Sequence, residues 1–265
     1  MLSISSENEE SVPRSENIMV MTSNHLRHRY FFNHLNHRFP IAVHFRERFK
    51  APTISFRSIY EENTWNWFFN RRREYEIKTF GSSDFLQAEN NPRIIRLHDL
   101  QINSPAWMDQ VKQFNPGLIV LFGTSLFCPE FINRYSGRII NLHIGLSEHY
   151  RGTNCNFWPI YENKLEYLGA TIHHVDNGID TGDIILQDTI RLEPDDNEQS
   201  LGGKTIILGT ELMISAIKLW KSNSLPSRKR KSTGRNYPSK NFNAQSIAKV
   251  KEMMESNQLR KNIES

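Results

Sequence analysis

Short apolar runs alternate along the chain with segments whose apolar residues recur at helical spacing. The apolar runs predict strands at residues 17–22, 41–45, 94–97, 118–122, 138–143, 168–175 and 183–190. The helical spacing predicts helices at residues 25–35, 64–72, 104–114, 129–135, 199–220 and 243–259. Alternating strands and helices are typical of α/β proteins, so we expect an open, mostly parallel Rossmann-like sheet with a short C-terminal extension.

The middle of the chain carries the clearest signals. The run at 118–122 is uninterrupted, as expected of a parallel strand buried on both faces. Ser104 followed by Pro105 is typical of a helix start. The strands at 168–175 and 183–190 are separated by the polar loop DNGIDTG, which predicts a hairpin or a paired sheet edge.

Composition divides the chain into three parts. Residues 1–16 are polar and unpatterned, so we expect a disordered arm. Residues 17–222 hold the predicted sheet and form the main domain. Residues 223–265 are expected to be a strap and a helix, because the stretch 222–240 is rich in Ser, Lys and Arg and contains two prolines.

Composition also excludes several classes of protein. Hydrophobic residues make up 38% of the 265 residues, which is enough for a folded core. No apolar run could cross a membrane and the acidic start does not resemble a signal peptide, so a cytoplasmic protein is expected. Cys128 and Cys155 are too few for a disulfide framework and are interpreted as reduced thiols. Part of the net charge of +4 lies in RKRK at 228–231, which we assign to a solvated surface strip.

The strand at 138–143 ends in the sequence N-x-H. Alternation along the strand puts Asn141 and His143 on one face at its carboxyl end, where open parallel sheets bind ligands. The amide can donate to a carbonyl oxygen that gains negative charge, and the His can donate beside it or move a proton. One of Asp176, Asp180 and Asp183 could charge the imidazole, and spacing does not separate them. This combination favours acyl transfer.

Residues 117–190 resemble the core of the formyltransferases that use 10-formyltetrahydrofolate. These include glycinamide ribonucleotide transformylase, methionyl-tRNA formyltransferase and the amino-sugar N-formyltransferases. The shared motifs are N-x-H, Y-R-G, a G-x-T/S-x-H strand and D-x-G-D/P-I, which occur in this order in LIVLFGTSLFCPEFINRYSGRIINLHIGLSEHYRGTN and YLGATIHHVDNGIDTGDIILQ. The resemblance implies that Asn141, His143 and Asp180 are catalytic, and so selects one of the three aspartates.

The resemblance also implies a direct transfer without an acyl-enzyme. The acceptor amine attacks the formyl carbon, and Asn141 and protonated His143 hold the oxygen of the intermediate. Asp180 stabilises the imidazolium and, with a water, helps to carry the amine's proton towards the leaving N10 of the folate. N10-formyltetrahydrofolate is the implied cofactor, and no metal is required.

The pterin of this folate is expected between residues 123–127 and 175–180, in an apolar slot with a few fixed polar groups. The cofactor-binding candidates are Phe122, Gly123, Ser125, Leu126, Phe127, Val175, Asp176 and Gly178. Phe122 and Leu126 are equally compatible with a position in the core.

One departure from the family pattern lies in the loop after His143. Family members often carry Pro where this chain has Glu148, which we interpret as a solvated carboxylate, with contact to the acceptor as the alternative. A metal cluster of His143 with His149, His173 and His174 is not expected, because His173 and His174 point to opposite faces of a strand.

For the acceptor, YRGTNCNFW and GRNYPSKNF resemble segments of amino-sugar N-formyltransferases, which implies a nucleotide-linked amino sugar. The turn TSNHLRH lacks a glycine-rich phosphate loop, which disfavours NAD and a glycinamide ribonucleotide. About 43 residues follow the long helix, too few for the barrel domain of tRNA-acting relatives. The acceptor-binding candidates are His25, Arg27, His28, Tyr150, Arg151 and Gly152, with the first three placed near the phosphates.

Three alternatives remain open at this point. They are a methionyl-tRNA formyltransferase, a hydrolase that releases formate from the same folate, and a non-catalytic nucleic-acid or partner-binding protein that uses residues 227–235. The expected partners are the nucleotide sugar and the reduced folate, with nucleic acid disfavoured, no membrane and a homodimer allowed.

Overall fold

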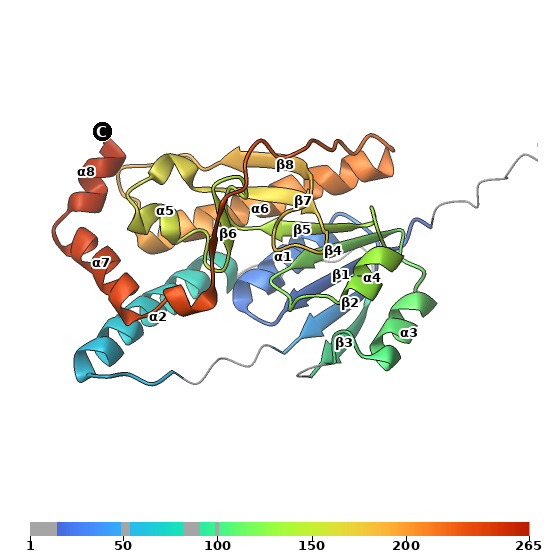
Figure 1. Ribbon diagram of the computed structural model, residues 1–265, viewed down its shortest axis with the longest axis horizontal. Helices are drawn as coiled ribbons and strands as arrows, with labels where there is room; N and C mark the ends of the chain where they lie inside the picture. The colour runs from blue at the N-terminus through green and yellow to red at the C-terminus, as the bar shows by residue number, and fades with distance from the viewer. Residues whose placement is uncertain (1–14, 49–53, 82–90, 99–100, 265) are drawn as a thin grey trace, which may run out of the picture.

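The computed structural model describes residues 15–48, 54–81, 91–98 and 101–264 (Figure 1). Residues 1–14, most of the predicted arm, lie outside this range. The strands in the described part are β1 (Ile18–Ser23), β2 (Ile41–Glu47), β3 (Arg93–Leu97), β4 (Leu118–Phe122), β5 (Ile139–His143), β6 (Tyr150–Gly152), β7 (Gly169–His174), β8 (Ile184–Thr189) and β9 (Arg235–Tyr237). The helices are α1 (Leu26–Asn36), α2 (Ile59–Phe80), α3 (Pro105–Gln113), α4 (Pro129–Arg134), α5 (Trp158–Tyr161), α6 (Glu198–Lys221), α7 (Ala244–Glu255) and α8 (Gln258–Glu264).

Seven of these strands form one twisted sheet in the order β3-β2-β1-β4-β5-β7-β8. The first five strands in this order run parallel, and β7 and β8 pair antiparallel at one edge. The predicted mostly parallel α/β sheet is therefore confirmed, as is the pairing of the two strands on either side of DNGIDTG.

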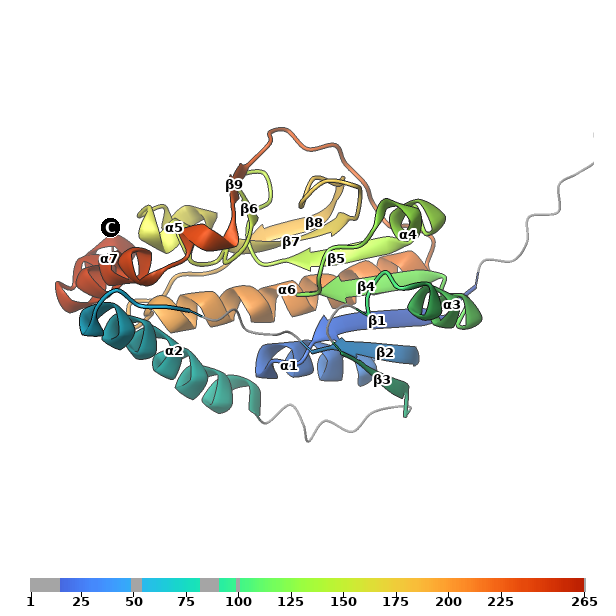
Figure 2. The same ribbon diagram turned by 60° about the horizontal axis from the view of Figure 1, so that its bottom comes forward.

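Alternating side chains of the sheet build two apolar layers. On β4, Val120 packs in a cluster with α1 and α6, whereas Ile119 packs in a cluster with α3 and α4. The run is apolar throughout because both of its faces are covered. Ser104 caps α3 by accepting from the backbone of Trp107, as predicted. Figure 2 shows α1 and α6 on one side of the sheet.

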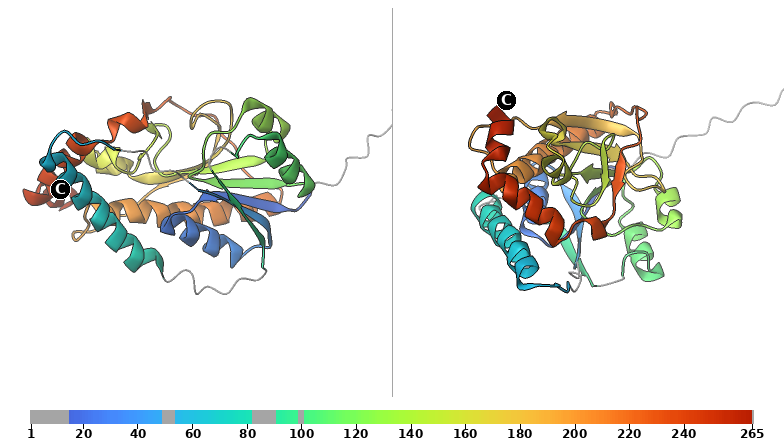
Figure 3. Two further views of the ribbon diagram at one scale, coloured as in Figure 1. Left: turned by 90° about the horizontal axis from the view of Figure 1, so that it is seen from below. Right: turned by 60° about the vertical axis from the view of Figure 1, so that its left-hand side comes forward.

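The largest difference from the predicted helices concerns α2, which extends far beyond the expected 64–72. Ser58 caps its first turn, and its buried Phe68 packs against Phe157 of a third apolar cluster. The predicted helix 243–259 is divided into α7 and α8, and Asn257 between them has φ +57°. Figure 3 shows α2 and the C-terminal helices together at one end of the molecule.

A small second sheet, absent from the sequence prediction, pairs β6 with β9 in parallel. These strands are only three residues long, too short to show a periodic pattern. Residues 222–234, named the connector below, run from α6 to β9 and arch over β8 (Figure 2). In place of a free linker, the chain here returns to the main domain, and Arg228 exchanges two backbone hydrogen bonds of 2.9 Å with Ile184.

Among the described helices, none combines the length and the apolar character needed to span a membrane.

Candidate active site

Asn141 and His143 lie on one face of β5, as the alternation predicted. This is the face covered by α3 and α4, because Ile139 on the same face belongs to their cluster. The antiparallel register sets His173 of β7 opposite Asn141 and Thr171 opposite His143. Four polar side chains are thus gathered at the point where the sheet changes from parallel to antiparallel pairing.

Asp180 completes this group from the loop between β7 and β8, residues 175–183, named the aspartate loop below. Its Oδ2 lies 3.4 Å from Nδ1 of His143, and its Oδ1 lies 3.5 Å from Nε2 of His173. The backbone N–H of Gly152 donates to Oδ2 at 2.9 Å. Asp180 has φ +50°, a left-handed conformation that is uncommon for residues other than glycine and often found at functional sites.

The other two aspartates of the loop point elsewhere. Asp176 accepts hydrogen bonds from the N–H of Gly178 and the hydroxyl of Thr181, so it braces the loop internally. Asp183 pairs with Lys229 at 2.9 Å. Of the three candidates, Asp180 is therefore the one that contacts His143.

Charges in this group are strongly coupled. Burial opposes a charge on His143, but the attraction of Asp180 outweighs it and holds the pKa of the imidazole well above its usual value. Burial also opposes ionisation of Asp180, yet the charge of His143 and its hydrogen bond hold the pKa of this carboxyl well below its usual value. The pair is therefore an imidazolium and a carboxylate at neutral pH.

Both ring nitrogens of His143 are engaged in the structure. Nδ1 faces Asp180, and Nε2 lies 2.9 Å from the carbonyl oxygen of Tyr150. The buried thiol of Cys155 lies beside the ring, and burial raises the pKa of this thiol. Both cysteines are free, as expected. The imidazolium can therefore stabilise negative charge through its own charge without giving up either hydrogen bond.

His173 is a residue of this site that sequence reasoning did not assign. Its Nε2 lies 3.1 Å from the amide nitrogen of Asn141, and its Nδ1 lies 2.7 Å from the carbonyl oxygen of His174. His173 orients the Asn141 amide, which has a second N–H to donate. The G-x-T/S-x-H motif contained the signal, since alternation puts Thr171 and His173 on one face.

The two loops predicted to hold a folate are anchored on the same apolar cluster. Phe127 and Val175 both pack against the cluster of α3 and α4. Phe127 stacks with Trp107 and Phe131. Asp176 and Gly178 keep the aspartate loop in shape, and a Cβ at Gly178 would lie 1.9 Å from Oγ1 of Thr181. These residues therefore hold the two loops in place on the core of the protein.

Three of the predicted folate contacts also have structural roles in the sheet and in the turn that follows β4. Phe122 is a buried core residue with an edge contact to His28. Gly123 has φ +64°, and a Cβ there would lie 2.5 Å from Nε2 of His28. Ser125 donates through its N–H and its hydroxyl to the buried carboxylate of Glu47, at 2.8 and 2.5 Å.

Exposed apolar side chains remain on both loops. Leu126 is 70% exposed and Ile179 is 40% exposed, which is unusual for large hydrophobic residues. Leu126 is therefore not a core residue, which resolves the alternative that the sequence left open. Two loops with free apolar tips and ordered backbone groups fit a planar heterocycle such as a pterin.

The turn after β1 differs from the expected phosphate site. Burial lowers the pKa of His28 well below its usual value, and the ring lies 2.5 Å from Oγ of Ser23. Arg27 pairs with Glu76 of α2 at 2.7 Å. Burial also lowers the pKa of His25. A neutral histidine and a neutralised arginine offer little charge for a diphosphate, so the geometry does not favour the predicted role of His25, Arg27 and His28.

The Y-R-G segment packs against the aspartate loop. The Tyr150 hydroxyl donates to Glu162 at 3.0 Å. Arg151 donates from Nε to the carbonyl of Gly234 at 2.8 Å and from a terminal nitrogen to the carbonyl of Ile179 at 3.0 Å. Gly152 donates its N–H to Asp180. Tyr150, Arg151 and Gly152, which were predicted to contact the acceptor, thus make hydrogen bonds within the protein that hold the site in place.

Two further expectations need correction. The basic run 228–231 is solvated only in part, because Lys229 is 89% exposed whereas Arg228 forms a two-pronged ion pair with Glu148 at 2.9 and 3.1 Å. Glu148 is buried rather than solvated, and its second partner is the N–H of Lys231 at 2.6 Å. The hydrogen bond from Arg228 is the main cause that lowers the pKa of Glu148 to about 2.

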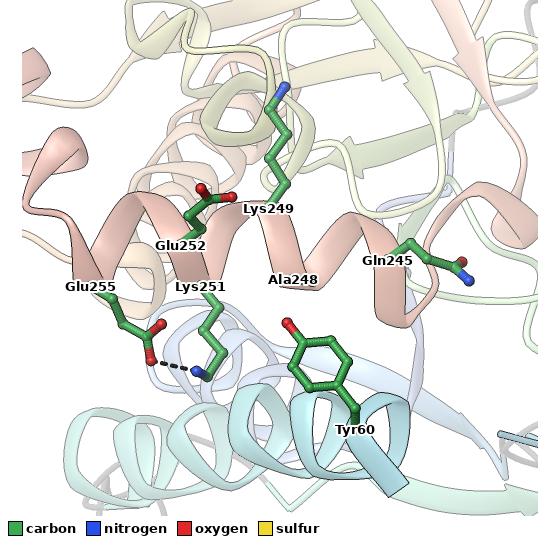
Figure 4. A pocket seen from close by; sticks show the side chains of 7 residues that line it. All are labelled: Tyr60, Gln245, Ala248, Lys249, Lys251, Glu252 and Glu255. Carbon is green, nitrogen blue, oxygen red and sulfur yellow. Dashed lines mark hydrogen bonds and ion pairs between the residues drawn. The ribbon is translucent and has the colours of Figure 1, made fainter. Parts of the chain in front are cut away.

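A groove at the other end of the molecule lies between the start of α2 and α7 (Figure 4). Its lining residues are Tyr60, Gln245, Ala248, Lys249, Lys251, Glu252 and Glu255. Lys251 and Glu255 pair with each other across one turn of α7. None of these residues belongs to β5, β7 or the aspartate loop. Within the described ranges, no group of three or more His, Cys, Asp or Glu side chains is arranged to hold a metal ion.

The known proteins that resemble this chain are formyltransferases, but their names do not agree on the acceptor. A family model described as "Formyl transferase" matches residues 69–217. The methionyl-tRNA formyltransferase of Caldanaerobacter subterraneus subsp. tengcongensis is 33% identical over 130 residues, which are 49% of this chain and 42% of that protein. The chain thus spans less than half the length of the curated relatives it matches.

Solved structures extend the similarity over most of the chain at the level of the fold. One is the formyltransferase PseJ from Anoxybacillus kamchatkensis, in complex with UDP-4,6-dideoxy-4-formamido-L-AltNAc and tetrahydrofolate. It is 15% identical with a TM-score of 0.52, and the match covers 87% of this chain and 97% of that chain. A 4-N formyltransferase from Francisella tularensis is 20% identical with a TM-score of 0.56, over 85% of this chain and 78% of that chain.

Proposed function

The chain belongs to the formyl transferase family, and from this premise we propose that it transfers a formyl group from N10-formyltetrahydrofolate to the amine of a nucleotide-linked amino sugar. The observation that carries the proposal is the contact of Asp180 with His143 beside Asn141. An imidazolium, its carboxylate and an oriented amide on one sheet face are the groups that an oxyanion intermediate requires.

Each side chain of the trio has a separable role in this reaction. Asn141 keeps one amide N–H for the formyl oxygen while His173 orients the other. His143 contributes its positive charge, which Asp180 sustains in the buried site. As the amine attacks, its proton passes with the help of Asp180 and a water to N10 of the folate, which leaves as the bond between N10 and the formyl carbon breaks.

Leu126 and Ile179 are the side chains that would hold the folate, together with backbone groups of their loops. When bound, the folate supplies the activated formyl group. The protein's part is to present an apolar slot beside Asn141 and to keep water from the reacting carbon.

Two observations support an amino-sugar acceptor. The segments that resemble amino-sugar enzymes, YRGTNCNFW and GRNYPSKNF, pair with each other through β6 and β9 and contact Asp180 through Gly152. One protein of similar fold is described as a sugar 3N-formyl transferase, and another was solved with a UDP-linked formamido sugar. A second candidate is formylation of methionyl-tRNA, which the names of the matched relatives favour.

The test is a panel of nucleoside-diphosphate amino sugars assayed beside charged initiator tRNA, with formyl addition read by mass spectrometry. We expect one or more sugars to gain a formyl group only in the presence of formyltetrahydrofolate. Asn141→Ala should lower this rate about 10²–10³-fold, and Asn133→Ala, an exposed change on α4, should not. Formylation of the tRNA alone would replace the sugar by the second candidate, and formate release without an acceptor would indicate a hydrolase.

A further inference from the structure

We propose that Arg230 of the connector is a positioning residue, whose guanidinium holds the aspartate loop in the conformation that presents Asp180 to His143. As a role in catalysis, this inference rests on the function proposed above. As a role in the geometry of the resting protein, it can be tested without any substrate.

The contacts of Arg230 join two loops that are distant in the sequence. One terminal nitrogen donates to the backbone carbonyl of Asp180, and the other donates to the backbone carbonyl of Ser147. Ser147 belongs to the loop that follows His143, so a single planar group ties the loop after β5 to the loop after β7. Only a guanidinium offers two such donors in a fixed geometry.

The conformation of Asp180 explains why such a tie is needed. Its φ of +50° is unfavourable for a residue with a side chain, and the surrounding structure must impose it. Arg151 bonds to the carbonyl of Ile179, so guanidinium groups hold two consecutive carbonyls of the loop. With the backbone fixed in this way, the carboxylate of Asp180 can meet the N–H of Gly152 and the ring of His143 together.

The connector is anchored on both sides of Arg230, which fixes where its guanidinium can reach. On one side, Arg228 pairs with Glu148 through its side chain and with Ile184 through its backbone. On the other side, the hydroxyl of Ser232 donates to the carbonyl of Glu148 at 2.7 Å. Arg230 is therefore delivered to the site by a braced segment and not by a free linker.

Several charged groups surround the pair that Arg230 positions. His143 faces Asp180, the Cys155 thiol and the ring of His173. Asp180 also faces the two histidines and the two arginines, Arg230 and Arg151. For Arg230, burial and the charge of Arg151 lower the pKa of the guanidinium, while Glu148, Asp180 and Asp176 act in the opposite direction. A guanidinium keeps its positive charge over the whole pH range of a histidine titration.

The test measures the pKa of His143 by NMR titration of the ligand-free protein in Arg230→Lys and Arg230→Met. The resonance of His143, one of ten histidines, is assigned by its absence in His143→Asn. Because Lys keeps the charge but not the two-pronged contact, we expect both variants to lower the pKa of His143 by about 1 unit or more. Lys231→Met is the control within the same run, because the side chain of Lys231 is exposed and its contact with Glu148 is made by the backbone N–H, so this variant should titrate as the wild type does.

Each outcome has a defined meaning. If the pKa of His143 in Arg230→Lys equals that of the wild type, the proposal is overturned. This holds even if Arg230→Met differs from the wild type, because a positive charge without the two-pronged contact would then be enough to position Asp180. If neither Arg230 variant folds, Glu148→Gln, which loosens the same anchor, should shift the pKa in the same direction, and no shift would overturn the proposal. With an identified acceptor, Arg230→Lys should lower kcat 10-fold or more while KM changes little. If the wild type formylates nothing, the proposed function fails, while the titration still decides the role of Arg230.

Discussion

Replacing Glu148 by Gln should destabilise the protein at neutral pH and should matter progressively less in acid. The change keeps the shape of the side chain and removes the charge that faces Arg228. Glu148 accepts hydrogen bonds from Arg228 and Lys231, so its ionised form is favoured in the folded state. The free energy of unfolding therefore depends on the ionisation of this one carboxyl.

The size of the effect follows from the pKa. The difference between the ordinary 4.5 and the value of about 2 in the folded state corresponds to at most about 3.4 kcal/mol, at 1.36 kcal/mol for each pKa unit. Arg228 is 43% exposed, so solvent screens the pair, and about 1–2 kcal/mol is the expected loss. In a domain of this size, the loss corresponds to a decrease in Tm of roughly 2–8 °C.

The sign with respect to pH is fixed by the direction of the pKa change. Because the folded-state pKa is lowered, the stabilisation is complete above about pH 4.5 and is lost as the pH falls towards 2. At pH 3, less than about half of it should remain. Urea unfolding of the wild type and Glu148→Gln between pH 7 and pH 3 measures this convergence.

Two comparisons make the experiment decisive. Asp195→Asn removes an exposed carboxylate and should have almost no effect at any pH. Arg228→Gln combined with Glu148→Gln should cost little more than Glu148→Gln alone, because the two residues act as a pair. An equal loss at pH 7 and pH 3, or no loss at pH 7, would refute the reasoning.

Three further predictions concern the site. Because the pKa of His143 is raised, the rate of formyl transfer, which needs the imidazolium, should stay constant through pH 6.5 and fall only well above it. In Asp180→Asn the residual rate should fall at lower pH, and coincident pH profiles of the two proteins would contradict this. Gly123→Ala should lower the free energy of unfolding by more than the roughly 1–2 kcal/mol expected for Gly137→Ala, because both glycines have positive φ but only a Cβ at Gly123 would clash with a neighbour. Equal decreases of the unfolding free energy of the two variants, measured in urea, would argue against this close packing. A non-transferring reduced folate should raise the Tm, and Leu126→Ser should weaken its affinity in calorimetry, whereas unchanged affinity would remove Leu126 from the folate slot.

The sequence by itself determined the sheet and the common face of Asn141 and His143. These features depend on the alternation of side chains along a strand and on the length of apolar runs, both of which are local. The same alternation set His173 beside them on the neighbouring strand, although its contact with Asn141 depends on the register between β5 and β7.

Which charged groups meet depends on the tertiary structure, and spacing along the chain did not determine it. Spacing left Asp176, Asp180 and Asp183 open, and the family resemblance selected the one whose distance to His143 the fold makes short. The role of the basic run also depended on the fold, since 80 residues separate Glu148 from Arg228. Whether an arginine is solvated or paired depends on which segments of the chain fold against it. A pattern read along the chain carries no information on that contact, because burial and charge pairing arise between residues that are neighbours only in space.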